Sequence, residues 1–499
     1  MIIYQLFPRV YGATPKKRCG TFSDINDKEL ERLKSLSVSH IWLTGVIRHS
    51  GWRDTNPLVT KGLAGSPYAI TDYFDIDPDL ATVKKNRMAE FEDAVQRIHS
   101  HGLKVIIDFV PNHLAREYKG DFGKNDDTSV AFSPKNDFYY CPNQKFVVPE
   151  GDSDKYYEFP AKATGNDVFS PTPSATDWYD TAKLNYGIDY SNGSKHFEPI
   201  PELWHKMLKI MQFWCEKGVD GFRVDMAEMV PVEFWRWAMA IIRKSFNIIM
   251  VAEIYQTNLY RQFVEAGFDY LYDKVGLYNT LENIYRHGQR VDTISDVWKG
   301  LNGLDDNMLR FMENHDEIRL ASRFFMQKPE NAFPYVALSA LMNRGPLMIY
   351  NGQEYGENAE SSDNGKTSIF DYVYMPSMIR RDVPWRVSTY EYYVNLLKFR
   401  ESHPAILHGA FYDLMWANPW YNNFDPQYVY AFLRYHGDDK LLIVINFNLN
   451  EGRNVTVTIP DDARKLIGGC NEKYDLDLKP SEVKIIELKD FSTPCGRSK

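Results

Sequence analysis

Four short apolar runs in this chain each end on a carboxylate, and this repeat constrains the fold more than any other feature. The runs are 104–108 (KVIID), 220–225 (DGFRVD), 248–253 (IIMVAE) and 309–316 (LRFMENHD). Each has the length of a buried strand and places an acid at its end. Barrels of parallel strands gather catalytic groups from distant parts of a chain in this way. The pattern therefore predicts an enzyme with several acids at one end of a sheet.

The order of strand-like and helix-like stretches predicts the same barrel. Near the N-terminus, the stretches 2–7, 40–46 and 104–110 have strand patterns, and helical patterns separate them. Strands that alternate with helices of this length imply parallel pairing through right-handed crossovers. The alternation resumes beyond the middle of the chain and gives enough strands to close a ring. We therefore predict the α/β class and a (β/α)8 TIM barrel formed by residues 1–113 and 185–404.

Two further segments depart from the alternation. Residues 114–184 show no sustained helical period and are rich in Pro, Gly, Asn, Asp and aromatic residues. A structureless connection of that length is improbable in a compact domain, so we predict a subdomain inserted after the third strand, over the barrel mouth. Residues 405–499 contain period-2 runs separated by turn residues, which predicts a C-terminal antiparallel β-sandwich domain.

Composition excludes several classes of protein. The net charge of −9 is spread without a basic block, which argues against nucleic acid as a partner. No apolar stretch approaches the roughly 20 residues that cross a bilayer, so no membrane partner is expected. The N-terminus lacks the features of a signal peptide, which favours the cytoplasm; a removed signal would make the protein periplasmic or secreted. The cysteines are odd in number and scattered, which disfavours disulfides or zinc: Cys19, Cys141, Cys215, Cys470 and Cys495.

The residues at the strand ends suggest different chemical roles for the acids. Arg223 and Asp225 lie two positions apart and so on the same face of a strand, where the guanidinium favours an ionised Asp225. Glu253 ends an apolar strand and is predicted to hold a proton at neutral pH. One ionised and one protonated carboxyl group, about 5 to 5.5 Å apart, are the apparatus of a retaining glycosidase. Asp316, with His315 beside it, would bind sugar hydroxyls and favour a positively charged transition state.

The ordered motifs of the chain resemble those of a known family. DFVPNH (108–113), GFRVD (221–225), AEIY (252–255) and ENHD (313–316) closely resemble the four signature regions of the α-amylase family of glycoside hydrolases. Further matches occur from the N-terminal YQLFPRVYG to GPLMIYNGQEYG, so the resemblance spans nearly the whole chain. It implies a barrel, a domain inserted after the third strand and a C-terminal β-sandwich.

The resemblance also implies roles for individual residues. Asp225 would be the nucleophile, Glu253 the general acid/base and Asp316 the transition-state stabiliser. Five further residues would contact or support the sugar in the cleavage subsite: Tyr68, Asp108, His113, Arg223 and His315. The implied function is a retaining α-glycosidase that acts on α-1,4-glucans such as starch or on maltooligosaccharides, by double displacement through a covalent glycosyl-enzyme. No cofactor is needed for this chemistry.

Several alternatives stay open at this point. Within the family they are an α-glucanotransferase or an α-glucosidase, since the sequence does not show whether water or a sugar is the acceptor, nor whether cleavage is endo or exo. A catalytically inactive glucan-binding relative is a remote alternative. From another class, the acids could hold magnesium in a barrel lyase, but the Arg next to Asp225 argues against it. The oligomeric state is not predicted.

Two positions depart from the family pattern. Where family α-amylases commonly carry a Lys-His pair that contacts sugar, this chain has Glu228 and Met229, so recognition on the leaving-group side is expected to differ. Where many members place an acidic calcium ligand, this chain has Lys183, although Asn112 is kept. An ammonium cannot ligate calcium and would repel it. We therefore hypothesise that Lys183 fills the position of that cation and that structural calcium is disfavoured.

Overall fold

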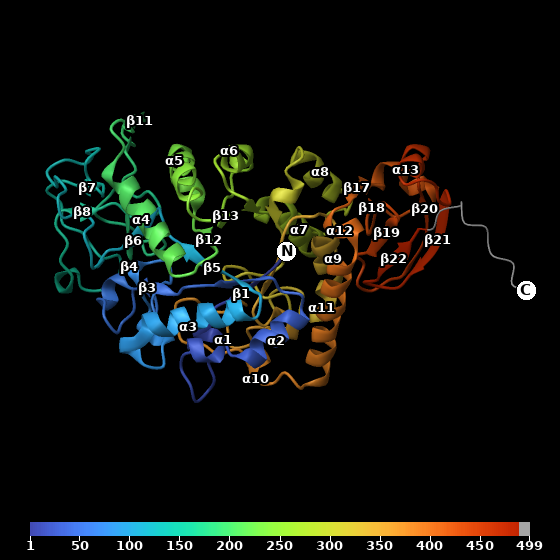
Figure 1. The fold of residues 1–499 in the computed structure, drawn as a ribbon, viewed down its shortest axis with the longest axis horizontal. Coiled ribbons are helices and arrows are strands. Elements are labelled where there is room, and N and C mark those ends of the chain that lie inside the picture. Colours follow the sequence, from blue (N-terminus) through green and yellow to red (C-terminus); the bar gives the residue numbers. More distant parts are fainter. Residues whose placement is uncertain (489–499) are drawn as a thin grey trace, which may run out of the picture.

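A computed structural model describes residues 1–488 and contains a closed ring of parallel strands, of which Figure 1 labels β1, β5, β12 and β13. In chain order the strands are β1 (Ile2–Leu6), β2 (His40–Leu43), β5 (Lys104–Phe109), β12 (Gly221–Val224), β13 (Ile249–Ala252), β14 (Tyr270–Tyr272), β15 (Met308–Leu309) and β16 (Leu347–Tyr350). Neighbouring strands in this order pair in parallel, and β16 pairs with β1. A parallel bridge between Arg310 and Leu347 joins β15 to β16. The predicted (β/α)8 barrel is confirmed.

Helices connect these strands on the outside of the ring. The principal ones are α2 (Asp27–Ser35), α3 (Arg87–Ser100), α4 (Glu202–Glu216), α5 (Val232–Ile242), α6 (Tyr260–Glu265), α7 (Asn279–His287), α8 (Thr293–Gly300), α9 (Phe333–Leu341) and α11 (Pro384–Ser402). α3 is an amphipathic example, in which Phe91, Ala94, Val95 and Ile98 are buried at helical spacing. That spacing turns one apolar stripe towards the barrel.

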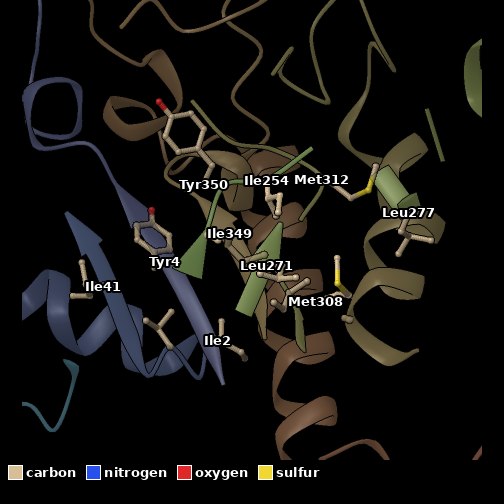
Figure 2. Close-up of a cluster of buried hydrophobic side chains, with 14 of the residues drawn as sticks. Ile2, Tyr4, Ile41, Ile254, Leu271, Leu277, Met308, Met312, Ile349 and Tyr350 are labelled. Carbon is tan, nitrogen blue, oxygen red and sulfur yellow. The ribbon is translucent and has the colours of Figure 1, made fainter. Parts of the chain in front are cut away.

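Alternation along each barrel strand separates two cores. Ile3, Trp42 and Met348 belong to a cluster inside the ring, whereas Ile2 and Tyr4 belong to the larger core between strands and helices. Figure 2 shows part of that outer core, with side chains from several strands meeting side chains from neighbouring segments. Because successive side chains point to opposite faces, both faces of these strands are apolar. This explains why the strands have the continuous apolar runs seen in the sequence.

The segment between β5 and α4 consists of loops and short two-stranded sheets. β6 (His113–Ala115) pairs with β9 (Thr181–Lys183), β7 (Tyr140–Cys141) with β8 (Ala161–Lys162), and β10 (Ile188–Asp189) with β11 (Ser194–Lys195). A further hairpin, β3 (Ile47–His49) with β4 (Ile70–Ile76), follows β2. The β6–β9 register places His113 opposite Lys183. The predicted domain boundaries at residues 114–184 stay a prediction.

The C-terminal part forms antiparallel sheets at the end of the molecule opposite the inserted segment (Figure 1). One sheet contains β17 (Ala410–Asp413), β18 (Val429–His436), β19 (Asp439–Asn446) and β22 (Val483–Glu487); a second contains β20 (Arg453–Thr458) and β21 (Lys473–Leu478). This agrees with the predicted C-terminal β domain. β17 and β21 were not predicted from the sequence, since their alternation is short or interrupted by charged residues.

Some sequence predictions concern features outside the fold itself. Cys495 lies outside the described residues, and the four cysteines within them are free. Within residues 1–488, no helix combines the length and apolar character that a bilayer span requires. The cytoplasmic location and the exclusion of nucleic acid stay predictions.

Candidate active site

The carboxyl ends of the barrel strands surround a cavity of about 350 Å³. Five of the predicted site residues line it: Tyr68, His113, Asp225, Glu253 and Asp316. The other three contact these residues from behind the lining: Asp108, Arg223 and His315. The structure therefore brings all of the sequence-predicted site residues together. Catalytic sites of TIM barrels occur at this end because every strand delivers its last residue there.

A single buried guanidinium connects three of the acids. Nη1 of Arg223 lies 2.8 Å from Oδ1 of Asp225 and 3.4 Å from Oδ1 of Asp108, and Nη2 lies 2.8 Å from Oε2 of Glu253. The contact with Glu253 is an ion pair without the alignment of a hydrogen bond, since Nη2 has no hydrogen-bond partner among the described residues. Nε donates to the Tyr272 hydroxyl at 3.2 Å. Arg223 thus fixes the acids of three neighbouring strands.

His315 links the opposite side of the cavity to the same set of groups. Its Nε2 lies 2.6 Å from the Tyr68 hydroxyl and 3.0 Å from Oδ2 of Asp316, and its Nδ1 lies 2.7 Å from Nε2 of Gln5. Burial alone would raise the pKa of Asp316, but the charge and hydrogen bond of His315 lower it to about 2. Asp316 is therefore a permanent anion at ordinary pH. Its side chain is 42% exposed, although the group lines the cavity rather than the outer surface.

Asp225 differs from the sequence-based expectation. Burial and the charge of Glu253 raise the pKa of Asp225 well above its usual value of 3.8, although Arg223 lowers it. The prediction that Arg223 leaves Asp225 with a lowered pKa is wrong, because burial and the charge of Glu253 outweigh the guanidinium. The guanidinium also contacts Glu253, so its charge is shared between the two acids. Burial also raises the pKa of Asp108, which accepts a hydrogen bond from the Gly45 amide at 3.0 Å.

Two contacts to Glu253 were not predicted from the sequence. The backbone amide of Met226 donates to Oε2 at 2.9 Å, and the Tyr255 hydroxyl donates to Oε1 at 2.7 Å. Met226 has φ 44° and ψ 48°, a left-handed conformation that is costly for a residue with a side chain. That conformation, directly after Asp225, directs the N–H of Met226 towards Glu253. The sequence signals for Tyr255 were its place in the AEIY motif and its position two residues after Glu253, which puts both side chains on one side of the chain.

Glu228 supports a loop behind the site. Its Oε2 accepts hydrogen bonds from the backbone amides of Tyr255 at 3.0 Å and Gln256 at 2.8 Å. It is not among the residues that line the cavity. The departure from the family pattern at this position therefore places a carboxylate under the loop that carries Tyr255.

His113 is held in one tautomer from behind. Nζ of Lys183 donates to Oδ1 of Asn112 at 2.8 Å, and Nδ2 of Asn112 lies 3.2 Å from Nδ1 of His113. Burial, followed by the charge of Lys183, lowers the pKa of His113 to about 3. The ring is therefore neutral, and acceptance at Nδ1 leaves the proton on Nε2. A neutral donor in this position can hydrogen-bond a sugar hydroxyl.

Paired acids on one guanidinium, with an anion and histidines around them, suit the cleavage of a glycosidic bond. One carboxyl group can protonate the leaving oxygen while the other attacks the anomeric carbon. Together with the barrel, this site defines a glycoside hydrolase. The family model described as Alpha amylase, catalytic domain, matches residues 5–389. The chain belongs to the alpha-amylase family.

Relatives support this assignment along the whole chain. The alpha-glucosidase of Pediococcus pentosaceus is 23% identical, with 98% of each chain covered. The oligo-1,6-glucosidase of Parageobacillus thermoglucosidasius is 22% identical over 98% of this chain and 97% of that protein. Among solved structures, the maltogenic alpha-amylase AmyB of Thermotoga neapolitana has a TM-score of 0.65, with 24% identity and 98% of both chains covered. That structural similarity shows a shared fold.

The raised pKa of Asp225 predicts the acid limb of the pH–activity profile. If Asp225 is the nucleophile that the family resemblance implies, it must be ionised, so activity is lost as the pH falls through its pKa, and a raised pKa moves that loss to higher pH. We expect the half-maximal point of kcat/KM on the acid side to lie above about pH 4, the ordinary value for Asp. A profile that stays flat to pH 3 would contradict the environment described for Asp225.

Proposed function

We propose that this protein is a retaining α-glycosidase that acts on α-1,4-linked glucans or maltooligosaccharides. The observation that carries the proposal is the meeting of Asp225 and Glu253 on the two terminal nitrogens of Arg223, at the wall of one cavity. Two acids on adjacent nitrogens are close enough to act on one anomeric centre. Retaining enzymes hold their two carboxyl groups about 5 to 5.5 Å apart, and contact with one guanidinium keeps Asp225 and Glu253 near each other.

The reaction has two displacement steps. Glu253 donates its proton to the glycosidic oxygen as Asp225 attacks the anomeric carbon from the opposite face, which breaks the glycosidic bond and forms a β-linked ester. Glu253, now ionised, removes a proton from water or a sugar hydroxyl, and that oxygen displaces Asp225 with retained α configuration. The Asp316 anion stabilises the positive charge that develops on the sugar ring in both steps.

The protonation state expected for the carboxylate cluster of the free protein is consistent with this scheme. Three carboxylates lie around one guanidinium, so the cluster carries excess negative charge when all three are ionised. Repulsion of this kind favours retention of one proton within the set. A bound substrate places its glycosidic oxygen where that proton is needed. The carboxylate cluster therefore retains a proton that can serve as the acid in the first step.

A transferase or an α-glucosidase of the same family would use the same residues. The names of two relatives, alpha-glucosidase and oligo-1,6-glucosidase, favour action on small substrates. A magnesium-dependent lyase is disfavoured because the Arg223 guanidinium already contacts Asp108, Asp225 and Glu253 and would repel a second cation there.

Substitution of the acid tests the proposal. We expect Glu253→Gln to lower kcat on maltooligosaccharides by about 10²–10⁴-fold while binding of maltooligosaccharide, measured by calorimetry, persists. Glu233→Gln is the matched control, because Glu233 lies on α5 and pairs with Lys195 away from the cavity. Unchanged turnover in Glu253→Gln would reject the assigned acid. A wild-type protein that binds maltooligosaccharides without turning them over would favour the inactive relative.

We also propose that Lys183 replaces a structural cation. Its side chain is 1% exposed, and Nζ lies 2.8 Å from Oδ1 of Asn112 and 2.5 Å from Oδ1 of Asp167. These oxygens are the kind that calcium would take, but an ammonium already lies between them and repels a second cation. The residues present therefore do not fit calcium at this position. The positive charge that contacts Asn112, which in turn contacts His113, is therefore the Lys183 ammonium and not a bound metal ion.

Removal of this lysine gives a direct test. Lys183→Met leaves Asn112 and Asp167 without their cation and is expected to lower the thermal midpoint, by less than the loss of a fully buried pair would, because Asp167 is 38% exposed and water can solvate its carboxylate. Wild-type protein treated with a chelator should keep its thermal midpoint and its activity. One tightly bound calcium per chain in metal analysis, lost together with stability on chelation, would refute the proposal.

A further inference from the structure

One side of the catalytic cavity is closed by loops that follow three different barrel strands. The loop at residues 60–67 and the loop at residues 366–372 join directly: the Phe370 carbonyl accepts a hydrogen bond from the Ala64 amide at 2.9 Å, and Oδ1 of Asp371 accepts one from the Leu63 amide at 3.1 Å. Gly62 has φ +66°, and a Cβ there would lie 2.4 Å from the Phe370 carbonyl oxygen. The junction therefore has no room even for a methyl group at Gly62.

Lys61 extends this closure to the inserted segment. Its Nζ donates to the Asp177 carbonyl at 3.0 Å and lies 3.6 Å from Oδ1 of Asp180. Trp178, between these two acids, packs against His113 with ring centroids 5.2 Å apart. The three loops thus form one continuous wall, which contributes Lys61, Asp180 and Phe370 to the lining of the cavity.

Asp180 carries an unused acceptor in this wall. The residue is 2% exposed, and its Oδ2 is buried with no hydrogen-bond partner among the described residues. Buried carboxylate oxygens are normally satisfied, so an unpaired one in a residue that lines a cavity points to a ligand that satisfies it. A sugar hydroxyl has the donor that this oxygen lacks.

The order of the strands shows which end of a substrate meets the wall. The loops of the wall follow β2, β5 and β16, whereas Glu253 follows β13. In the ring, β13 lies four strands from β1 in either direction, and β1 lies between β2 and β16. The two loops that follow β2 and β16 are therefore across the barrel from the acid, and the loop that follows β5 joins them from a position two strands from β13. Because Glu253 protonates the leaving oxygen, the leaving group lies on its side and the wall faces the glycone.

We infer that the glycone side of this site is a closed pocket, so that the enzyme removes units from the non-reducing end of a chain, with Asp180 accepting a hydroxyl of the terminal sugar. The inference rests on the proposed function and adds to it the position of cleavage. The cavity of about 350 Å³ is near the lower end of the usual range for ligand pockets, about 300–1,000 Å³. A chain that continued beyond the cleaved unit would have to cross the Lys61–Asp180 pair or the Phe370 junction.

A pair of substrates tests the closed wall in the wild-type protein. One is p-nitrophenyl α-maltoheptaoside with a free non-reducing end; the other carries a 4,6-O-ethylidene group on that end. We expect cleavage of the free substrate from its non-reducing end and a rate at least about 100-fold lower on the blocked one, read by chromatography of the products. Comparable rates, or internal cleavage products from both, would overturn the inference. Cleavage of neither would instead reject the proposed function on which the inference rests.

Two variants assign the effect to the wall. Asp180→Asn keeps the shape and is expected to raise KM for the free substrate about 10-fold or more, as loss of a charged acceptor does. Phe370→Ala should raise the rate on the blocked substrate relative to the free one. Asp154→Asn, an exposed acid of the inserted segment, is the control for Asp180→Asn. Thermal midpoints equal to that of the wild type would exclude misfolding of the variants. An unchanged KM in Asp180→Asn would show that Asp180 does not bind the substrate. If a variant fails to fold, the comparison of the two substrates with the wild-type protein still tests the closed wall.

Discussion

The ion pairs between the buried Arg223 guanidinium and three acids are the interaction on which the rest of the site depends. Arg223 is 1% exposed, and its guanidinium lies 5.2 to 5.5 Å from the rings of Trp42, Tyr68 and Tyr272. A charge this deeply buried is stable only when it is paired. The acids at the ends of β5, β12 and β13 pair with the guanidinium. These ion pairs also offset the free-energy cost of burying the carboxylates themselves. The barrel thus stabilises a cluster of opposite charges that no single loop could hold.

The supporting groups around this cluster also use charges of the chain. Lys183 lies where it can orient Asn112 and so His113, and Glu228 holds the backbone of the loop that carries Tyr255. Both positions depart from the family pattern, and both place an ionised side chain behind the site rather than in the cavity. We therefore expect these two positions to act on the orientation of His113 and of the loop that carries Tyr255.

Much of the site could be predicted because its signals are local. An acid at the end of an apolar run, such as Asp108 or Glu253, identifies a strand end at the active face of a barrel, and these predictions placed the residues correctly. The shared role of Arg223 could not be predicted, since it depends on the distance between β12 and β13 in the closed ring. For the same reason the acidity of Asp225 was misjudged: burial and a neighbouring acid act through space, not along the sequence.

The contacts among the loops of the cavity wall could not be predicted from the sequence. The wall joins residues 60–67, 177–181 and 366–372, which are far apart in the chain and have no common pattern. The central claim, attack by Asp225 on a sugar activated from the other side by Glu253, is tested most directly by trapping the ester. A 5-fluoro-α-glucosyl fluoride, whose leaving group needs no acid, should label the protein covalently, and peptide mass mapping should place the sugar on Asp225. A label on Asp108 or Asp316, or a protein that turns over substrate without ever being labelled, would contradict this account.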